Sequence, residues 1–332
     1  IDDDTVLSAT RDNRLVLWSI ENGTLNRDVG VSTHTLQQII VSHDSRFALV
    51  QANGGEAYLW SIAQTSPALS QIISDAVTGT AINQTGDRIL IPSNSGVVLQ
   101  NIETQQAIIT LNNASITGMN ATGTHFAVII DDSIMLYDAR TGIEQKSWLI
   151  NVDDIRNLIV SPSGGQVLAS TISGDVWLMR SDTEGAIPLN TEGVTPPFAM
   201  KFNADGSTFM TLHAESATQW ETATASEYQR FPLGLPDSSP LDKRVKMAFG
   251  DEDDSIIFFV ELDNNLAGLT GFQADSTDVN RQTFVDVVYG ELSADGSTLL
   301  LALTDNSIHI VDTDSGEILR RLVGHSDTVR IL

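Results

Sequence analysis

Apolar and polar residues alternate in blocks along this chain. A short apolar run, a tight polar turn and a second apolar run recur about every forty residues. The turn is recognisable in Thr85-Gly86-Asp87, Ala204-Asp205-Gly206 and Ala294-Asp295-Gly296. The run after each turn, such as Phe47–Ala52 or Thr298–Thr304, is almost entirely apolar, which is typical of strands buried on both faces. Two further strands complete each unit, and four short strands at this period predict a β-propeller blade.

We label the strands of a blade a to d from the centre outward. Eight candidates for strand a predict eight blades in one all-β domain over residues 1–332. Residues 328–332 supply only a strand a and residues 1–29 only strands b, c and d, so the two ends are expected to close the ring as one antiparallel four-stranded blade. The expected blades are 328–332 with 1–29, 35–74, 77–112, 115–150, 155–193, 197–234, 244–284 and 285–323.

The alternative is that the chain is part of a longer array of blades, in which residues beyond 332 would complete another blade. Closure is favoured because a closed ring leaves no long sheet edge open. The chain begins Ile1-Asp2-Asp3-Asp4 without Met, and we expect it to be a segment of a longer protein.

The residues at the junction of the two ends resemble a WD repeat. Gly324-His325 precedes an inner strand, and the start of the chain adds Ser8, Thr10, Asp12 and a strand that ends in Trp18. The resemblance implies a buried hydrogen-bonded tetrad of His325, Ser8 or Thr10, Asp12 and Trp18. The other blades diverge, and the partial copies are Leu59-Trp60-Ser61-Ile62 and Leu136-Tyr137-Asp138-Ala139.

Composition narrows the chemistry. The chain has no cysteine, which excludes disulfides, thiolate zinc sites and cysteine nucleophiles. Its net charge of −25 disfavours binding to nucleic acid and to anionic membranes. No apolar run is long enough to span a membrane. The compartment stays open, with the cytoplasm favoured. The six histidines lack zinc-ligand spacing, and Asp251-Glu252-Asp253-Asp254 lacks the alternating order of a calcium loop, so we expect no metal or other cofactor.

The turns between strands b and c bring acidic residues to one mouth of the channel. The longest connection, residues 233–244, should lie on the same face. The alternatives are that the acidic residues are ordinary turn residues and that the long connection is an insertion without a function. We predict that this face binds a basic peptide or protein, through Asp131, Asp132, Glu215, Asp263, Asp305, Asp237, Lys243 and Arg244.

The function that the WD-repeat resemblance implies is a non-catalytic scaffold or binding module, monomeric as an isolated domain. No nucleophile motif or phosphate loop stands out. The alternative is a propeller enzyme of quinoprotein dehydrogenase or lactonase type. Asp138-Ala139-Arg140-Thr141-Gly142 and Asp312-Thr313-Asp314-Ser315-Gly316 resemble turns of eight-bladed quinoproteins, but ordinary WD repeats contain the same turns.

Overall fold

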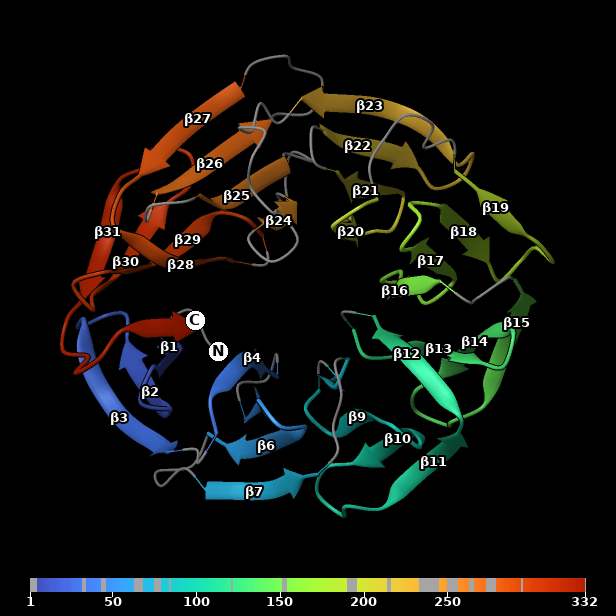
Figure 1. Cartoon of the computed structure of the whole chain (residues 1–332), viewed down its shortest axis with the longest axis horizontal. Helices are drawn as coiled ribbons and strands as arrows, with labels where there is room; N and C mark the ends of the chain where they lie inside the picture. The colour runs from blue at the N-terminus through green and yellow to red at the C-terminus, as the bar shows by residue number, and fades with distance from the viewer. Residues whose placement is uncertain are drawn as a thin grey trace.

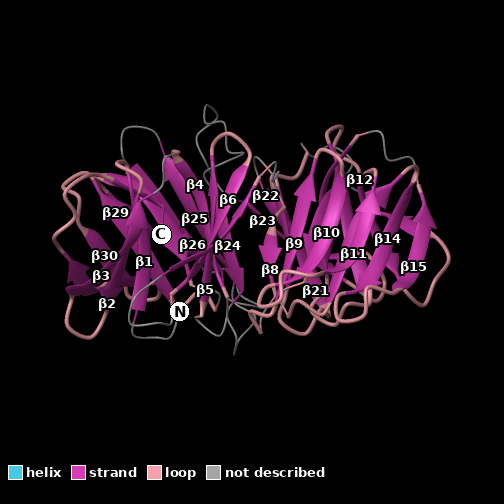
Figure 2. Cartoon of the chain, turned by 90° about the horizontal axis from the view of Figure 1, so that it is seen from below, coloured by secondary structure: helices cyan, strands magenta, loops and turns pink. Residues whose placement is uncertain are grey.

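The chain folds into eight four-stranded antiparallel sheets, arranged around a centre as the blades of a propeller (Figure 1). The side view shows strands and loops, and no helix, in the part of the chain that the structure describes (Figure 2). This computed structural model describes residues 5–31, 34–42, 46–62, 68–74, 79–83, 85–120, 122–150, 154–189, 196–213, 216–232, 245–249, 256–262, 266–272, 279–293 and 295–331. The predicted all-β, eight-bladed fold is confirmed.

The first four blades run from the ring closure through half of the circle. From the centre outward, blade 1 contains β32 (Val329–Ile331), β1 (Thr5–Thr10), β2 (Arg14–Ser19) and β3 (Thr24–Val31). Blade 2 contains β4 (Leu36–Val41), β5 (Phe47–Ala52), β6 (Glu56–Ser61) and β7 (Ala68–Ile73). Blade 3 contains β8 (Ala81–Ile82), β9 (Arg88–Ser93), β10 (Gly96–Asn101) and β11 (Ala107–Asn112). Blade 4 contains β12 (Ala114–Met119), β13 (His125–Ile130), β14 (Ser133–Asp138) and β15 (Glu144–Leu149).

The remaining blades complete the circle. Blade 5 contains β16 (Ile155–Val160), β17 (Gln166–Thr171), β18 (Val176–Arg180) and β19 (Ala186–Pro188). Blade 6 contains β20 (Ala199–Phe202), β21 (Thr208–Leu212), β22 (Ser216–Glu221) and β23 (Ser226–Pro232). Blade 7 contains β24 (Val245–Phe249), β25 (Ile256–Leu262), β26 (Leu266–Phe272) and β27 (Val279–Phe284). Blade 8 contains β28 (Val287–Leu292), β29 (Thr298–Leu303), β30 (Ile308–Asp312) and β31 (Ile318–Leu322).

The ring closes through its two ends, as predicted. β32 pairs antiparallel with β1, with Ala9 opposite Ile331 and Thr10 opposite Val329. Beyond the strands, the Arg11 N–H donates to the Thr328 carbonyl at 2.9 Å. The two ends of the chain therefore form one blade, and the inner edge of β1 is covered.

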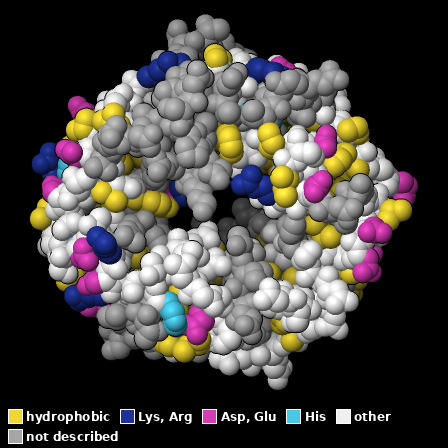
Figure 3. Space-filling view, in the orientation of Figure 1, with side chains coloured by type: hydrophobic (Ala, Val, Ile, Leu, Met, Phe, Trp, Pro, Cys, Tyr) yellow, Lys and Arg dark blue, Asp and Glu magenta, His cyan; other side chains and the backbone are white. Residues whose placement is uncertain are grey.

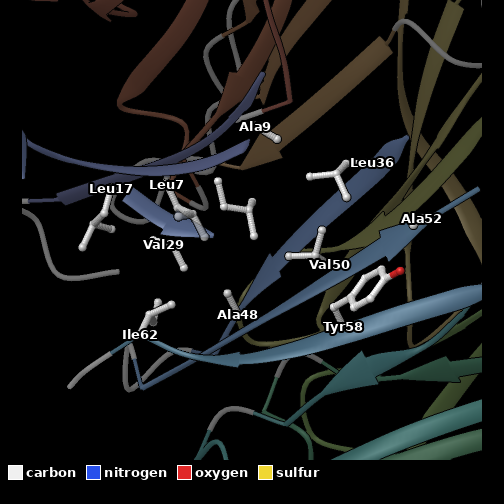
Figure 4. Close-up of a cluster of buried hydrophobic side chains, with 11 residues drawn as sticks. Leu7, Ala9, Leu17, Val29, Leu36, Ala48, Val50, Ala52, Tyr58 and Ile62 are labelled. Atoms are coloured by element: carbon white, nitrogen blue, oxygen red, sulfur yellow. The ribbon is translucent and has the colours of Figure 1, made fainter. Parts of the chain in front are cut away.

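Each seam between two blades contains its own apolar core. Within the described residues, eight clusters of buried side chains correspond to the eight seams, because each cluster combines residues of two neighbouring blades. Figure 4 shows the seam between blades 1 and 2, where Leu7 and Leu17 of blade 1 belong to the same buried cluster as Leu36 and Val50 of blade 2. A blade thus buries both of its faces only because it has a neighbour on each side.

The inner strands converge at the centre of the ring, and two of them need glycine. A Cβ at Gly118 of β12 would lie 2.2 Å from the Leu158 carbonyl oxygen of β16. A Cβ at Gly290 of β28 would lie 2.2 Å from the ring of Phe259. Both distances are far below van der Waals contact, so these glycines permit the close approach of neighbouring blades.

Closure of the ring by β32 predicts a sharp difference between two valines of the C-terminal segment. Val329 is fully buried between blades 8 and 1, whereas Val323 is 70% exposed. Val329→Asp should lower the free energy of unfolding by roughly 3 kcal/mol or more, because a charge enters an apolar seam. Val323→Asp should change it by less than about 0.5 kcal/mol. Urea denaturation of both variants checks this, and equal effects would contradict closure through β32.

Candidate functional site

Three residues of the expected tetrad meet at the ring closure. The Trp18 indole N–H of β2 donates to Ser8 Oγ of β1 at 3.1 Å and to Nε2 of His325 at 3.0 Å. Ser8 Oγ lies 2.9 Å from the same Nε2. Trp18 is 1% exposed and Ser8 is fully buried. The group therefore links both ends of the chain inside the seam between blades 8 and 1.

The structure does not bring Asp12 to this group. The Thr10 hydroxyl, two residues earlier in the same b–c turn, donates to the Asp12 carboxylate. Nδ1 of His325 is buried and has no hydrogen-bond partner among the described residues. The expected tetrad is therefore a three-residue network, and Asp12 with Thr10 forms a separate contact in the exposed turn.

His325 is held in its neutral form. Burial lowers the pKa of its imidazole to about 4, and the Asn306 backbone only partly opposes this shift. Nε2 faces the Trp18 N–H, so it provides a lone pair and the ring proton resides on Nδ1. The imidazole is half-buried and contacts Ser8 and Trp18, so it contributes to the packing of this seam.

A similar network, with Thr in place of Ser, occurs in blade 6. The Trp220 indole N–H donates to Thr211 Oγ1 at 2.9 Å, and Nε2 of His213 lies 2.9 Å from the same oxygen. Thr211 is fully buried, and His213 and Trp220 are 1% and 2% exposed. The sequence analysis missed this group because His213 comes from the b–c turn and no Gly-His precedes the blade.

The two networks share one register position on strand c. Trp18 pairs with Val6, two residues before Ser8, and Trp220 pairs with Phe209, two residues before Thr211. The strand pairs place one residue of each blade at this seam-filling position. These residues are Trp18, Trp60, Gln100, Tyr137, Met179, Trp220, Phe272 and Val311. Val311 of blade 8 has the smallest side chain of the eight.

A groove opens where the smallest of these residues stands. It has a volume of ≈490 Å³, lies in the seam between blades 7 and 8, and is lined by Val311, Leu303, Phe284 and Asp305 among others. The corresponding space beside Trp18 and His325 measures only ≈50 Å³. The large residue Trp18 at the seam-filling position thus coincides with a filled seam, and the small residue Val311 coincides with an open one.

The residues predicted for the b–c face fall into two groups, those that the structure describes and those outside the described residues. Asp131 and Asp132 are exposed between β13 and β14, and Asp305 is exposed between β29 and β30. Asp305 also caps its own turn: the Ser307 N–H and hydroxyl donate to it at 2.9 and 2.6 Å and lower its pKa. The other predicted residues lie outside the described residues: Glu215, Asp263, Asp237, Lys243 and Arg244.

The central channel carries basic groups that the sequence analysis did not single out. Arg156, Lys201 and Lys246 lie on the inner strands β16, β20 and β24, and Lys and Arg side chains border the central opening in Figure 3. Lys246 Nζ lies 2.8 Å from Glu291 and 3.1 Å from the Tyr289 hydroxyl, both on β28. This group ties the inner edges of blades 7 and 8 together.

The protonation of this inner group follows from burial and charge. Burial, reinforced by Glu291, raises the pKa of Tyr289 to about 12. Burial would lower the pKa of Lys246, but Glu291 and Tyr289 outweigh it and raise that pKa. At neutral pH the group is therefore an ammonium–carboxylate pair bridged by a neutral phenol, with each member already partnered.

The described residues contain neither a cluster of metal ligands nor a membrane-spanning helix. No group of three or more His, Cys, Asp or Glu side chains there could hold a metal ion. The acidic turn at residues 251–254 lies outside that part of the chain. The described residues also contain no helix of the length and hydropathy needed to cross a membrane.

Comparison with known proteins identifies the fold and no family. No family model matches the chain. No curated protein sequence matches it. Among solved structures, 1623 chains match. The chain is similar to the dihydro-heme d1 dehydrogenase NirN in complex with DHE, at a TM-score of 0.69 and 12% identity over 98% of this chain and 73% of that one. It is also similar to a chain of the mitotic checkpoint complex, at a TM-score of 0.60 and 15% identity over 84% and 90%. At such identities the likeness shows the propeller fold alone.

The hydrogen bonds of the two Trp networks predict that not every buried Trp is equivalent. Trp148 of β15 is also 1% exposed, but its Nε1 has no hydrogen-bond partner among the described residues. Trp18→Phe and Trp220→Phe should therefore each cost about 1–3 kcal/mol of unfolding free energy more than the matched control Trp148→Phe, because they leave polar partners unsatisfied. Chemical denaturation of the three variants checks this, and equal losses would refute a stabilising role for the networks.

Proposed function

We propose that the chain is a non-catalytic binding module of WD-repeat type that takes a basic segment of a partner protein. The segment docks on the face formed by the b–c turns and the connections from strand d to the next strand a. The observation that supports this most directly is the exposure of Asp131, Asp132 and Asp305 on that one face. Rigid strands fix the positions of these carboxylates, so a partner pays little for ordering them.

The charge of the whole chain supports the chemistry of the partner. A net charge of −25 repels acidic proteins and attracts basic ones before contact. In the b–c turns Asp131, Asp132 and Asp305 are exposed, and in the central channel Lys246 is paired with Glu291. We expect association that weakens with salt, since exposed charges are screened within about 8–10 Å at ordinary ionic strength.

The competing function is a propeller enzyme, and one of the similar structures is a dehydrogenase. That likeness shows a shared propeller fold but no shared site. No specific observation therefore favours catalysis in this chain. His325 and His213, which could otherwise be candidate acid–base groups, are both engaged in seam networks. An absorbance spectrum and metal analysis of the purified protein test this choice, and a stoichiometric chromophore or metal would overturn it.

Charge reversal on the two faces tests the proposed function. Asp131, Asp132 and Asp305 are changed together to Lys, and the matched control changes Glu103, Asp182 and Glu184 to Lys. The control acids are 66%, 80% and 96% exposed and lie in c–d turns, on the opposite face. Binding of peptides selected from a random displayed library is then measured by fluorescence anisotropy at low and moderate salt.

The expected result is enrichment of Lys- and Arg-containing peptides whose affinity falls about tenfold or more in the first variant and little in the control. Affinity should also fall with rising salt. If the control variant alone loses binding, the face is wrong. If the selection yields no basic peptides, the proposed partner chemistry is wrong.

A further inference from the structure

The open seam between blades 7 and 8 differs from the closed seam between blades 8 and 1 in two ways. Val311 occupies the position that Trp18 fills in blade 1, as the pairs Leu299 with Val311 and Val6 with Trp18 show. The connection into the blade is also shorter. Five residues, including His325, separate Leu322 from Thr328, whereas only three separate Gln282, the register equivalent of Leu322, from Asp286.

The backbone hydrogen bonds support this alignment of the two connections. The Arg11 N–H donates to the Thr328 carbonyl, and the Thr304 N–H donates to the Asp286 carbonyl at 2.8 Å. Thr328 and Asp286 thus occupy equivalent places. Blade 8 lacks both the indole and the imidazole that fill the space in blade 1, which accounts for the groove of ≈490 Å³.

The walls of the groove are apolar. Leu301 and Val311 are buried at its base, and Phe284 and Leu303 are partly buried beside them. Val285 and Ile318 remain 63% and 45% exposed at its edges. The volume lies within the range of about 300–1,000 Å³ that is typical of ligand pockets. Covering this surface with an apolar side chain would be favourable.

The mouth of the groove on the b–c face is acidic. Asp286 and Asp305 both line the groove and are exposed, and the Thr304–Asp286 hydrogen bond joins the two turns that carry them. His309 also lines the groove, and its pKa is lowered by burial and by Arg321, so it is neutral at neutral pH. Arg321 pairs with His309 across β30 and β31 but does not line the groove.

We propose that this groove binds an extended peptide segment of the partner protein in which one large apolar side chain stands next to Lys or Arg. The apolar side chain occupies the space that Trp18 and His325 fill in blade 1. The basic side chain meets Asp286 and Asp305 at the mouth. The proposal rests on the proposed function and deepens it, because it names one seam as the place where the basic segment inserts.

Two variants separate the groove from the rest of the face. Val311→Trp places an indole at the position where blade 1 has Trp18, and it should fill the groove. Gln100→Trp is the matched control, since it adds the same ring at the same register position of blade 3. Asp286→Asn with Asp305→Asn removes the charge at the mouth through exposed residues, and Asn tolerates the left-handed backbone of Asp286 (φ 61°). Circular dichroism verifies that each variant is folded.

The probes are peptides selected on the wild-type protein from a random linear library. We expect an apolar residue beside Lys or Arg in the selected peptides. Their affinity should fall about tenfold or more in Val311→Trp and in the double Asn variant, and should be unchanged in Gln100→Trp. If Val311→Trp fails to fold, the double Asn variant decides.

The outcomes distinguish the two proposals. Basic peptides that bind Val311→Trp and the double Asn variant as tightly as the wild type, but lose affinity on charge reversal of Asp131 and Asp132, would overturn the groove and leave the proposed function standing. Selected peptides without basic residues, or no selected peptides, would overturn both.

Discussion

The structure depends on one packing constraint: a blade of four strands is buried on both faces only by its two neighbours. No layer of helices covers the sheets in the described residues, so every apolar face must meet the next blade across a seam. The ring must therefore close, and β32 supplies the missing inner strand of blade 1. The same constraint explains Gly118 and Gly290, which lie where an inner strand packs closely against the neighbouring blade.

The seam-filling position on strand c connects this packing constraint to the proposed binding groove. A Trp at that position, with a hydroxyl and an imidazole as partners, closes the seam in blades 1 and 6. Val311 leaves the equivalent space open in blade 8, and carboxylates line this space. The negative net charge of the chain also favours a basic partner. The candidate site is thus a local departure from the repeat, on a scaffold whose other seams stabilise it.

The period, the blade number and the closure could be predicted from the sequence because they depend on local patterns: apolar runs, turns and two incomplete ends. The group of Ser8, Trp18 and His325 followed from a motif resemblance. Asp12 could not be placed, because Thr10 competes for its carboxylate at short range. The network of Thr211, His213 and Trp220 and the groove at Val311 were missed because both depend on cross-strand register. An alignment of the eight blades by the strand-c residue that pairs near the start of strand b brings out both Trp220 and Val311.

The central claim is that the side chain at the seam-filling position decides whether a seam is filled or open. Differential scanning calorimetry of Val311→Trp, with Met179→Val at the same position of blade 5, tests it most directly. Met179 is fully buried, so its truncation should lower the Tm. Val311→Trp should leave the Tm unchanged or raise it, because the indole enters existing space. A fall in the Tm of Val311→Trp as large as that of Met179→Val would contradict the account.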